Sequence, residues 1–316
     1  MIGYAVRRGG FALATVLVSA VGVFSLQRLI PGGPARALAG LNASPQALQS
    51  INARLGLDHP FVVQFWDWLS SAVQGDLGRS YQTQQPVTTI IDQHFVPTLE
   101  LVGFSLAVSL VLGGLIGTWS ALRADRPDGK VIFFSTGLGL SVPDFWVGTL
   151  AAGVFGLTLH WVPAVGYVSL SSSIGGNLQS VVLPVLVISL ASSALVARQL
   201  RSGLVGVLSA PHVRTARALG VPRAAMFRQD MLRLAAGPVV TIVPLLFAGL
   251  VGSAVVVENV FNIPGLGTAI IQAVNNRDYP TLQGITLLLC VAVIALNILA
   301  DLVGGALDPR RRAGAR

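Results

Sequence analysis

Charged side chains are scarce in this sequence. Of its 316 residues only 11% are charged, whereas 53% are hydrophobic; a soluble globular domain typically carries about 25% charge. A water-soluble fold of this length could not bury so much apolar surface. The composition therefore excludes most soluble classes and predicts a protein whose solvent is largely lipid.

Cysteine and lysine are almost absent, and each occurs once. Cys290 cannot form an internal disulfide, and no clustered Cys or His residues accompany it as metal ligands. A phosphate-binding glycine loop needs a lysine followed by a hydroxyl side chain, but Lys130 is followed by Val131. Neither a His-Glu-x-x-His pair nor a nucleophile elbow is present. We expect no catalytic residue, metal or cofactor in this chain, and a transport role powered from elsewhere.

Long uncharged runs predict an all-α polytopic protein with about six transmembrane helices. One run of 53 residues, from Phe145 to Ala197, is too long for a single helix, and a turn-rich stretch divides it. The spans are expected near residues 9–27, 101–122, 131–159, 178–197, 234–257 and 282–300.

Basic residues predict the orientation of these spans. With the N-terminus inside, sixteen of the 21 Lys and Arg residues lie on the inner side and five on the outer side. This bias places both termini in the cytoplasm. It also explains the net charge of +8 without nucleic acid as a partner. Arg7 and Arg8 before the first run allow a cleaved signal as the alternative to a retained span.

The spans leave two segments outside the lipid. In the outer one, Phe61, Phe65, Leu69 and Val73 recur every four residues, which predicts an amphipathic helix on the membrane or on other outer loops. The predicted organisation is an N-terminal transmembrane helix (1–30), an extracytoplasmic insert (31–97), a transmembrane core (98–306) that contains an inner loop (198–234), and a cytoplasmic tail (307–316).

The inner loop contains a predicted short helix. Pro211 suits its first turn, Ser209 offers a capping hydroxyl, and Gly220 suits the position after its end. Arg214 and Arg217 share one edge, while Ala216 and Leu219 form a small apolar knob. So short a helix needs a surface to dock against. Lipid headgroups would serve, and so would another protein.

Thr215-Ala216-Arg217-Ala218-Leu219-Gly220 resembles the EAA loop of ATP-binding-cassette (ABC) importer permeases, in its dipeptide/oligopeptide version. Further stretches match this family, and the chain resembles its B-type inner-membrane subunit. These stretches are Leu55–Pro60, Gly75–Ser80, Pro97–Glu100, Trp161–Ala164, Phe261–Gly267, Arg277–Pro280 and Asp308–Arg310. The chain departs from the family pattern at Thr215, where the loop has an acidic residue, and at Leu219, where lysine is common.

The resemblance implies a type I ABC-importer permease architecture with a cytoplasmic coupling helix. Arg214, Thr215, Ala216, Arg217, Ala218, Leu219 and Gly220 would contact the ATPase. The implied partners are a homologous second permease, two ATPase domains that bind ATP and Mg, an extracytoplasmic substrate-binding protein and the bilayer of a bacterial cytoplasmic membrane.

Three acids are candidates for the translocation path. Asp144 lies deep in the third predicted span, where it could meet a peptide amino group. The favoured interpretation is structural, because Ser141-Val142-Pro143-Asp144 resembles a capping box at a proline break. Glu100 and Glu258 are interpreted as solvating groups at the outer ends of helices.

The implied function is ATP-driven import of di- or oligopeptides. Nickel, glutathione or haem are alternative substrates within the same family. An ion-coupled secondary transporter is the rival mechanism, but it predicts acids at broken helices and an inverted repeat, of which only Asp144 is present.

Overall fold

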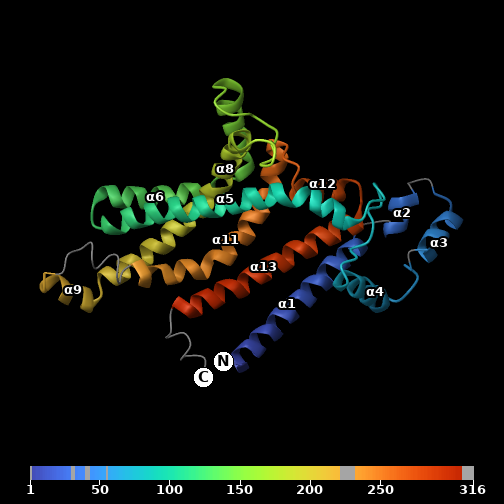
Figure 1. Ribbon diagram of the computed structural model, residues 1–316, viewed down its shortest axis with the longest axis horizontal. Coiled ribbons are helices and arrows are strands. Elements are labelled where there is room, and N and C mark those ends of the chain that lie inside the picture. Colours follow the sequence, from blue (N-terminus) through green and yellow to red (C-terminus); the bar gives the residue numbers. More distant parts are fainter. Residues whose placement is uncertain (1, 30–32, 40–42, 55, 221–231, 308–316) are drawn as a thin grey trace. The chain divides into compact units, whose positions relative to one another are not determined.

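The computed structural model describes residues 2–29, 33–39, 43–54, 56–220 and 232–307 (Figure 1). These parts of the chain are helical, as predicted, and they contain no strand; one isolated antiparallel bridge joins Arg79 and Pro86. The helices are α1 (Ile2–Leu29), α2 (Gly33–Ala39), α3 (Pro45–Arg54), α4 (Phe61–Val73), α5 (Val87–Leu122), α6 (Pro127–Ser141), α7 (Asp144–Ala151), α8 (Ile174–Leu208), α9 (Pro211–Ala218), α11 (Leu232–Phe261), α12 (Leu266–Asn275) and α13 (Tyr279–Leu307), with a π-helix, η1 (Ala152–Thr158), after α7.

Four helices within the described residues are long and apolar enough to cross a membrane. These spans are Val87–Leu122, Ile174–Leu208, Gly237–Phe261 and Tyr279–Ala300, and the bent pair Pro127–Ser141 and Asp144–Thr158 would be a fifth. Within α1, the apolar helical stretch Gly9–Ser25 is shorter than these spans. The predicted count of six therefore stays a prediction, although helices occur at all six predicted places.

The third predicted span, 131–159, is not one straight helix. It is bent by 95° between α6 and α7. Val142 and Pro143 are extended and lie at the break. Proline lacks an amide hydrogen and clashes with the preceding turn, so α6 ends at Ser141 and a new helix begins at Asp144. The favoured interpretation of a proline break before Asp144 is therefore confirmed, whereas the single span predicted over 131–159 is divided into two helices.

The other long helices extend beyond their predicted ends. Helix α5 begins at Val87 rather than near residue 101, and Pro97 is accommodated inside it. Its 36 residues correspond to roughly 54 Å at ~1.5 Å per residue, against a hydrocarbon thickness of ~30 Å. Helix α8 similarly continues through Arg198 and Arg201 to Leu208, so the predicted inner loop begins within a helix.

The chain divides into two compact units, of which the first comprises residues 1–98 and 264–295. There α4 forms as predicted. Phe61, Phe65 and Leu69 of its apolar stripe pack on α1, whereas Val73 is exposed. Phe65 is buried and its ring centroid lies 5.7 Å from that of Phe24, with Phe61 at 5.4 Å from Phe24. On the other side of α4, Val62 and Trp66 are exposed.

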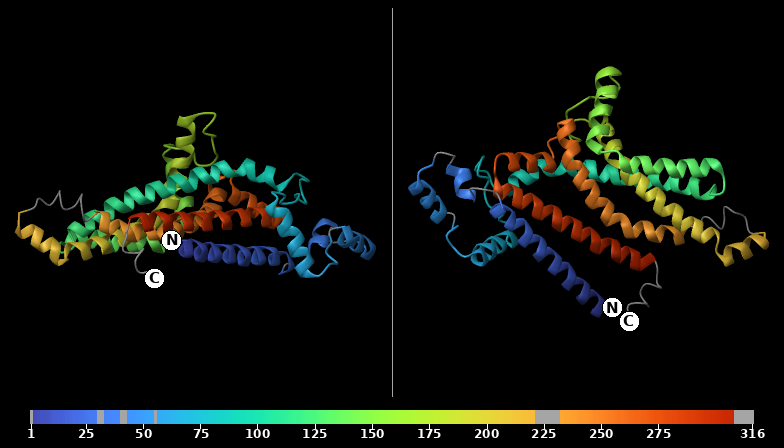
Figure 2. Two further views of the ribbon diagram at one scale, coloured as in Figure 1. Left: turned by 60° about the horizontal axis from the view of Figure 1, so that its bottom comes forward. Right: turned by 180° about the vertical axis from the view of Figure 1, so that it is seen from behind.

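The second unit comprises residues 99–263 and 296–316, and α8 lies at its centre (Figures 1 and 2). The most buried part of this unit is α8, which packs against α6, α7 and α11. Along α5, Ser105, Ser109, Gly113 and Gly117 recur every four residues and face α8. The Ser105 hydroxyl donates to the Val185 carbonyl over 3.4 Å.

The two glycines permit the close approach of α5 and α8 that their spacing predicts. A Cβ added to Gly113 would lie 2.6 Å from the Ser193 carbonyl oxygen and 2.6 Å from Val196 Cβ. One added to Gly117 would lie 2.7 Å from the Ala197 carbonyl oxygen. No larger residue fits these positions without moving the backbone of α8.

Candidate functional site: a short anchored helix and the acids of the spans

Helix α9 forms where the inner loop predicts it. It begins at Pro211 and ends at Ala218. Gly220 follows with φ +77°, the left-handed conformation expected after a helix end. Ser209 does not serve as the predicted cap, because its hydroxyl donates to the Gly206 carbonyl over 3.0 Å at the end of α8.

One residue anchors α9 to the ends of the long helices. Val213 is only 3% exposed and packs with Ala121 of α5 and with Leu200 and Leu204 of α8. The turn before it is closed by a hydrogen bond from the Val213 amide to the Ala210 carbonyl at 3.1 Å. An eight-residue helix is unstable alone, so this contact supplies the support it needs.

The rest of the described surface of α9 is available to another molecule. Leu219 is 78% exposed and Thr215 is also exposed. The side chains of Arg214, Ala216 and Arg217 lie outside the described residues, so their predicted roles stay predictions. Helix α9 is thus docked through Val213, and the exposed apolar residue Leu219 follows its last turn.

Glu100 does not solvate a helix end, contrary to the prediction, because it lies inside α5 and joins a polar network. Its Oε2 accepts hydrogen bonds from the Tyr167 hydroxyl at 2.8 Å and from Asn177 Nδ2 at 2.9 Å. Asn177 is fully buried and also donates to the Val168 carbonyl at 2.9 Å. Burial, and then the hydrogen bond to Glu100, raise the pKa of Tyr167. The network fixes the loop before α8 to both α5 and α8.

Asp144 is half-buried at the first position of α7. Its Oδ2 accepts a 2.5 Å hydrogen bond from the Ser253 hydroxyl of α11. The predicted capping box is absent, since the Ser141 hydroxyl donates to the Gly137 carbonyl and Pro143 occupies the cap position. The hydrogen bond links the start of α7 to α11.

Glu258 is also not a solvating group at a rim. Its side chain is completely buried near the end of α11, and its carbonyl accepts a hydrogen bond from the Ile263 amide at 2.8 Å. Full burial removes Glu258 from any water-filled path in this conformation. Of the three predicted acids, Asp144 and Glu100 are half-buried and Glu258 is fully buried.

A second polar network, in the first unit, was not found by sequence reasoning. Asp278 is 5% exposed and accepts hydrogen bonds from the Ser80 hydroxyl at 2.6 Å, the Tyr81 amide at 2.9 Å and the Thr281 hydroxyl at 2.7 Å. Burial and the nearby Asp278 raise the pKa of Tyr81 to about 12. The network joins two of the family-like stretches, which are nearly 200 residues apart in sequence. It therefore holds Ser80 and Tyr81 against the start of α13.

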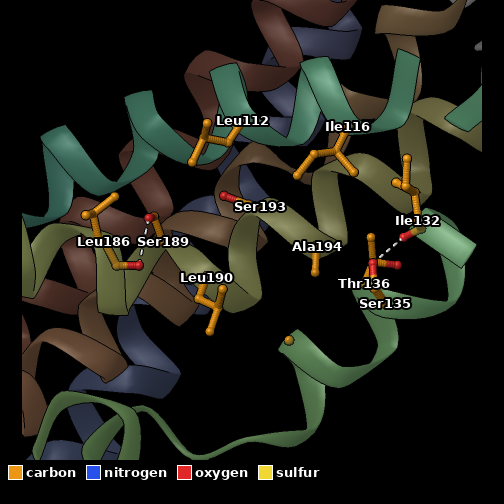
Figure 3. A pocket seen from close by; sticks show the side chains of 11 residues that line it. Leu112, Ile116, Ile132, Ser135, Thr136, Leu186, Ser189, Leu190, Ser193 and Ala194 are labelled. Atoms are coloured by element: carbon orange, nitrogen blue, oxygen red, sulfur yellow. Dashed lines mark hydrogen bonds between the residues drawn. The ribbon is translucent and has the colours of Figure 1, made fainter. Parts of the chain in front are cut away.

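An open groove of about 380 Å³ lies in the second unit between α5, α6 and α8 (Figure 3). Leu112 and Ile116 of α5, Ile132 of α6 and Leu190 of α8 line it. The sequence offered no signal for this groove, because it depends on how α6 packs beside α8. Among the described residues no cluster of His, Cys, Asp and Glu could hold a metal ion.

Comparison with known proteins defines the class. The model of the family described as "Binding-protein-dependent transport system inner membrane component" matches residues 113–313, and the model of the corresponding N-terminal region matches residues 1–102. The chain therefore belongs to this family and is an ABC-importer permease subunit.

Relatives cover the whole chain. A protein of Brucella abortus (strain 2308), whose name assigns it to a peptide transport system as permease, is 36% identical over 99% of both chains. The glutathione transport system permease of Salmonella typhi is 37% identical over 99% of both. A chain of the inward-facing MetNI methionine ABC transporter has a TM-score of 0.56 at 15% identity, covering 70% of this chain and 97% of that one. This likeness confirms the ABC-transporter permease fold.

Proposed function

We propose that this chain imports peptides across a bacterial cytoplasmic membrane, paired with a homologous permease and driven by two ATPase domains. A binding protein outside the membrane delivers the peptide, and both termini of the chain face the cytoplasm. The observation that carries the proposal is the way α9 is docked. Val213 is buried against α5 and α8, whereas the side chain of Leu219 is exposed.

The proposed coupling mechanism follows from this docking of α9. ATP and Mg bind the partner ATPases, and the ATPases move when they close on ATP. Arg214–Gly220 is the segment they grip. Because Val213 fixes α9 to Leu200 and Leu204, a push on α9 moves the inner end of α8 as one body. The path then alternates between its outward-facing and inward-facing states.

Asp144 is the proposed contact for the peptide's amino group. It is half-buried, and Ser253 holds its carboxylate from one side. A positively charged amino group would meet a fixed carboxylate near the 95° bend between α6 and α7. Glu100 has a structural part in the proposal, because its hydrogen bonds hold the loop that contains Tyr167.

The test replaces residues 214–220 with a flexible linker of equal length in the assembled transporter. We expect ATP hydrolysis to lose its stimulation by substrate-loaded binding protein, and uptake into proteoliposomes to stop. A matched control replaces residues 169–172, an exposed loop before α8. Uptake that continues unchanged with the 214–220 linker would show that another segment couples ATP to transport.

Glutathione is the second candidate substrate, because a 37% identical relative carries that name. Ligands that copurify with the cognate binding protein, together with competition of labelled dipeptide uptake by glutathione, nickel or haem, distinguish the candidates. Competition by glutathione at lower concentration than by di- or oligopeptides would replace the peptide assignment.

A further inference from the structure

The groove between α5, α6 and α8 is apolar through most of its length. Leucine and isoleucine side chains form most of its walls (Figure 3). In a bilayer, an apolar groove alone gives no hydrophobic preference for a protein partner over a lipid chain, since lipid chains are as apolar as its walls. What distinguishes this groove is the pair of cations beside one end.

Arg198 and Arg201 lie on α8 just beyond the groove residue Ala194. The guanidinium of Arg201 lies 4.0 Å from the centroid of the Phe133 ring of α6, and that of Arg198 lies 5.1 Å from the same centroid. Neither arginine has an acidic partner within 4.0 Å among the residues that the structure describes. Two guanidinium groups thus converge on one aromatic ring with their charges uncompensated.

The two arginines are held in place rather than free in solvent. Arg201 Nε donates to the Ser120 carbonyl over 3.4 Å, which leaves the outer fork of its guanidinium for a ligand. Arg198 is exposed, so its charge can be reached. A planar guanidinium matches the oxygens of a phosphate, and the stacking on Phe133 fixes its direction.

Ser193 adds a donor on the wall of the groove. Its side chain is 5% exposed, and its Oγ has no hydrogen-bond partner within the described part of the chain, although the residue lines the groove. On α8, Ser193 precedes Arg198 by five residues, or ~7.5 Å of rise. Cations, a hydroxyl and then apolar walls follow one another along the groove, which is the order of groups in a phospholipid.

We propose that this groove binds an anionic phospholipid of the cytoplasmic leaflet, with its phosphate on Arg198 and Arg201 and an acyl chain against Leu112, Ile116 and Leu190. Under the predicted orientation, α8 runs inward and its arginines lie at the cytoplasmic surface, where anionic lipid is available. The proposal does not depend on which substrate is transported.

The experiment is native mass spectrometry of the intact transporter titrated with phosphatidylglycerol or phosphatidylcholine. Arginine near a membrane surface contributes about fivefold to anionic-lipid binding, so Arg198→Gln/Arg201→Gln should weaken phosphatidylglycerol binding roughly 30-fold. The Arg198→Lys/Arg201→Lys variant keeps the charge and should lose much less. Arg36→Gln/Arg277→Gln, which removes two exposed arginines elsewhere, is the matched control and should bind as wild type does.

Two results would overturn the proposal. Equal retention of phosphatidylglycerol by the wild type and the Arg198→Gln/Arg201→Gln variant would show that the arginines do not hold the phosphate. A photocrosslinker at Ile132 that labels the partner permease rather than lipid in proteoliposomes would show that a protein helix fills the groove. Labelling of phosphatidylglycerol from Ile132, lost in the Gln variant but not in the control, is the expected result.

Discussion

Replacing Gly113 by alanine should destabilise the packing of α5 on α8, whereas the same change at Gly114 should not. The added Cβ at Gly113 lies 2.6 Å from two atoms of α8, but at Gly114 it meets nothing within 4 Å. Both alanines gain the same helix propensity, about 1 kcal/mol. The difference between the variants therefore isolates the overpacking, which costs about 1–3 kcal/mol.

The assay is equilibrium unfolding of the purified permease in mixed micelles, followed by tryptophan fluorescence. We expect Gly113→Ala to unfold at lower denaturant than Gly114→Ala, with a gap of about 1–3 kcal/mol between their unfolding free energies. Gly117→Ala, with its Cβ 2.7 Å from the Ala197 carbonyl, should behave like Gly113→Ala. Equal stability of the Gly113 and Gly114 variants would refute the close contact of α5 with α8.

Two further changes test the anchoring of α9 by Val213 and the hydrogen bonds accepted by Asp278. Val213→Ala removes two buried methyl groups and should weaken the docking of α9 by about 1.5–2.5 kcal/mol. The measurements are faster hydrogen exchange at 211–218 and less transport per ATP hydrolysed. As the control, Val205→Ala removes the same atoms from a 37% exposed side chain and should have little effect. Asp278→Ala leaves Ser80 and two other donors without their acceptor and should cost at least about 2–3 kcal/mol of unfolding free energy in a chemical denaturation curve. Docking unchanged in Val213→Ala, or full stability of Asp278→Ala, would contradict these assignments.

In both units a carboxylate holds a loop against a helix. In the first unit, Asp278 accepts a hydrogen bond that holds the loop of Ser80 against the start of α13. In the second unit, Glu100 accepts hydrogen bonds that hold the loop of Tyr167 against α5 and α8. Each network uses a carboxylate that accepts several hydrogen bonds at once, which makes its loop rigid.

Sequence reasoning placed the helices well where one physical signal dominates. Uncharged runs located the long helices, because an uncompensated charge in lipid is costly. Pro211 and Gly220 bounded α9 correctly. Helix ends were less accurate, since a helix that leaves the hydrocarbon loses the apolar signal but keeps its backbone hydrogen bonds.

The acids were interpreted less well from sequence. Glu100 and Glu258 were expected at solvated helix ends, yet one joins a network and the other is fully buried. The partners of Glu100 are Tyr167 and Asn177, which are 67 and 77 positions away in the sequence. No local pattern encodes a pairing at that separation.

By itself, the sequence determined that this protein is helical and embedded in lipid, and through its motifs to which family it belongs, because hydrophobicity and short motifs are properties of neighbouring residues. Only the tertiary structure decided that the chain bends by 95° at Pro143, that Val213 anchors α9, and that Arg198 and Arg201 meet over Phe133. Those features depend on which surfaces of distant helices come together, and that is settled by packing.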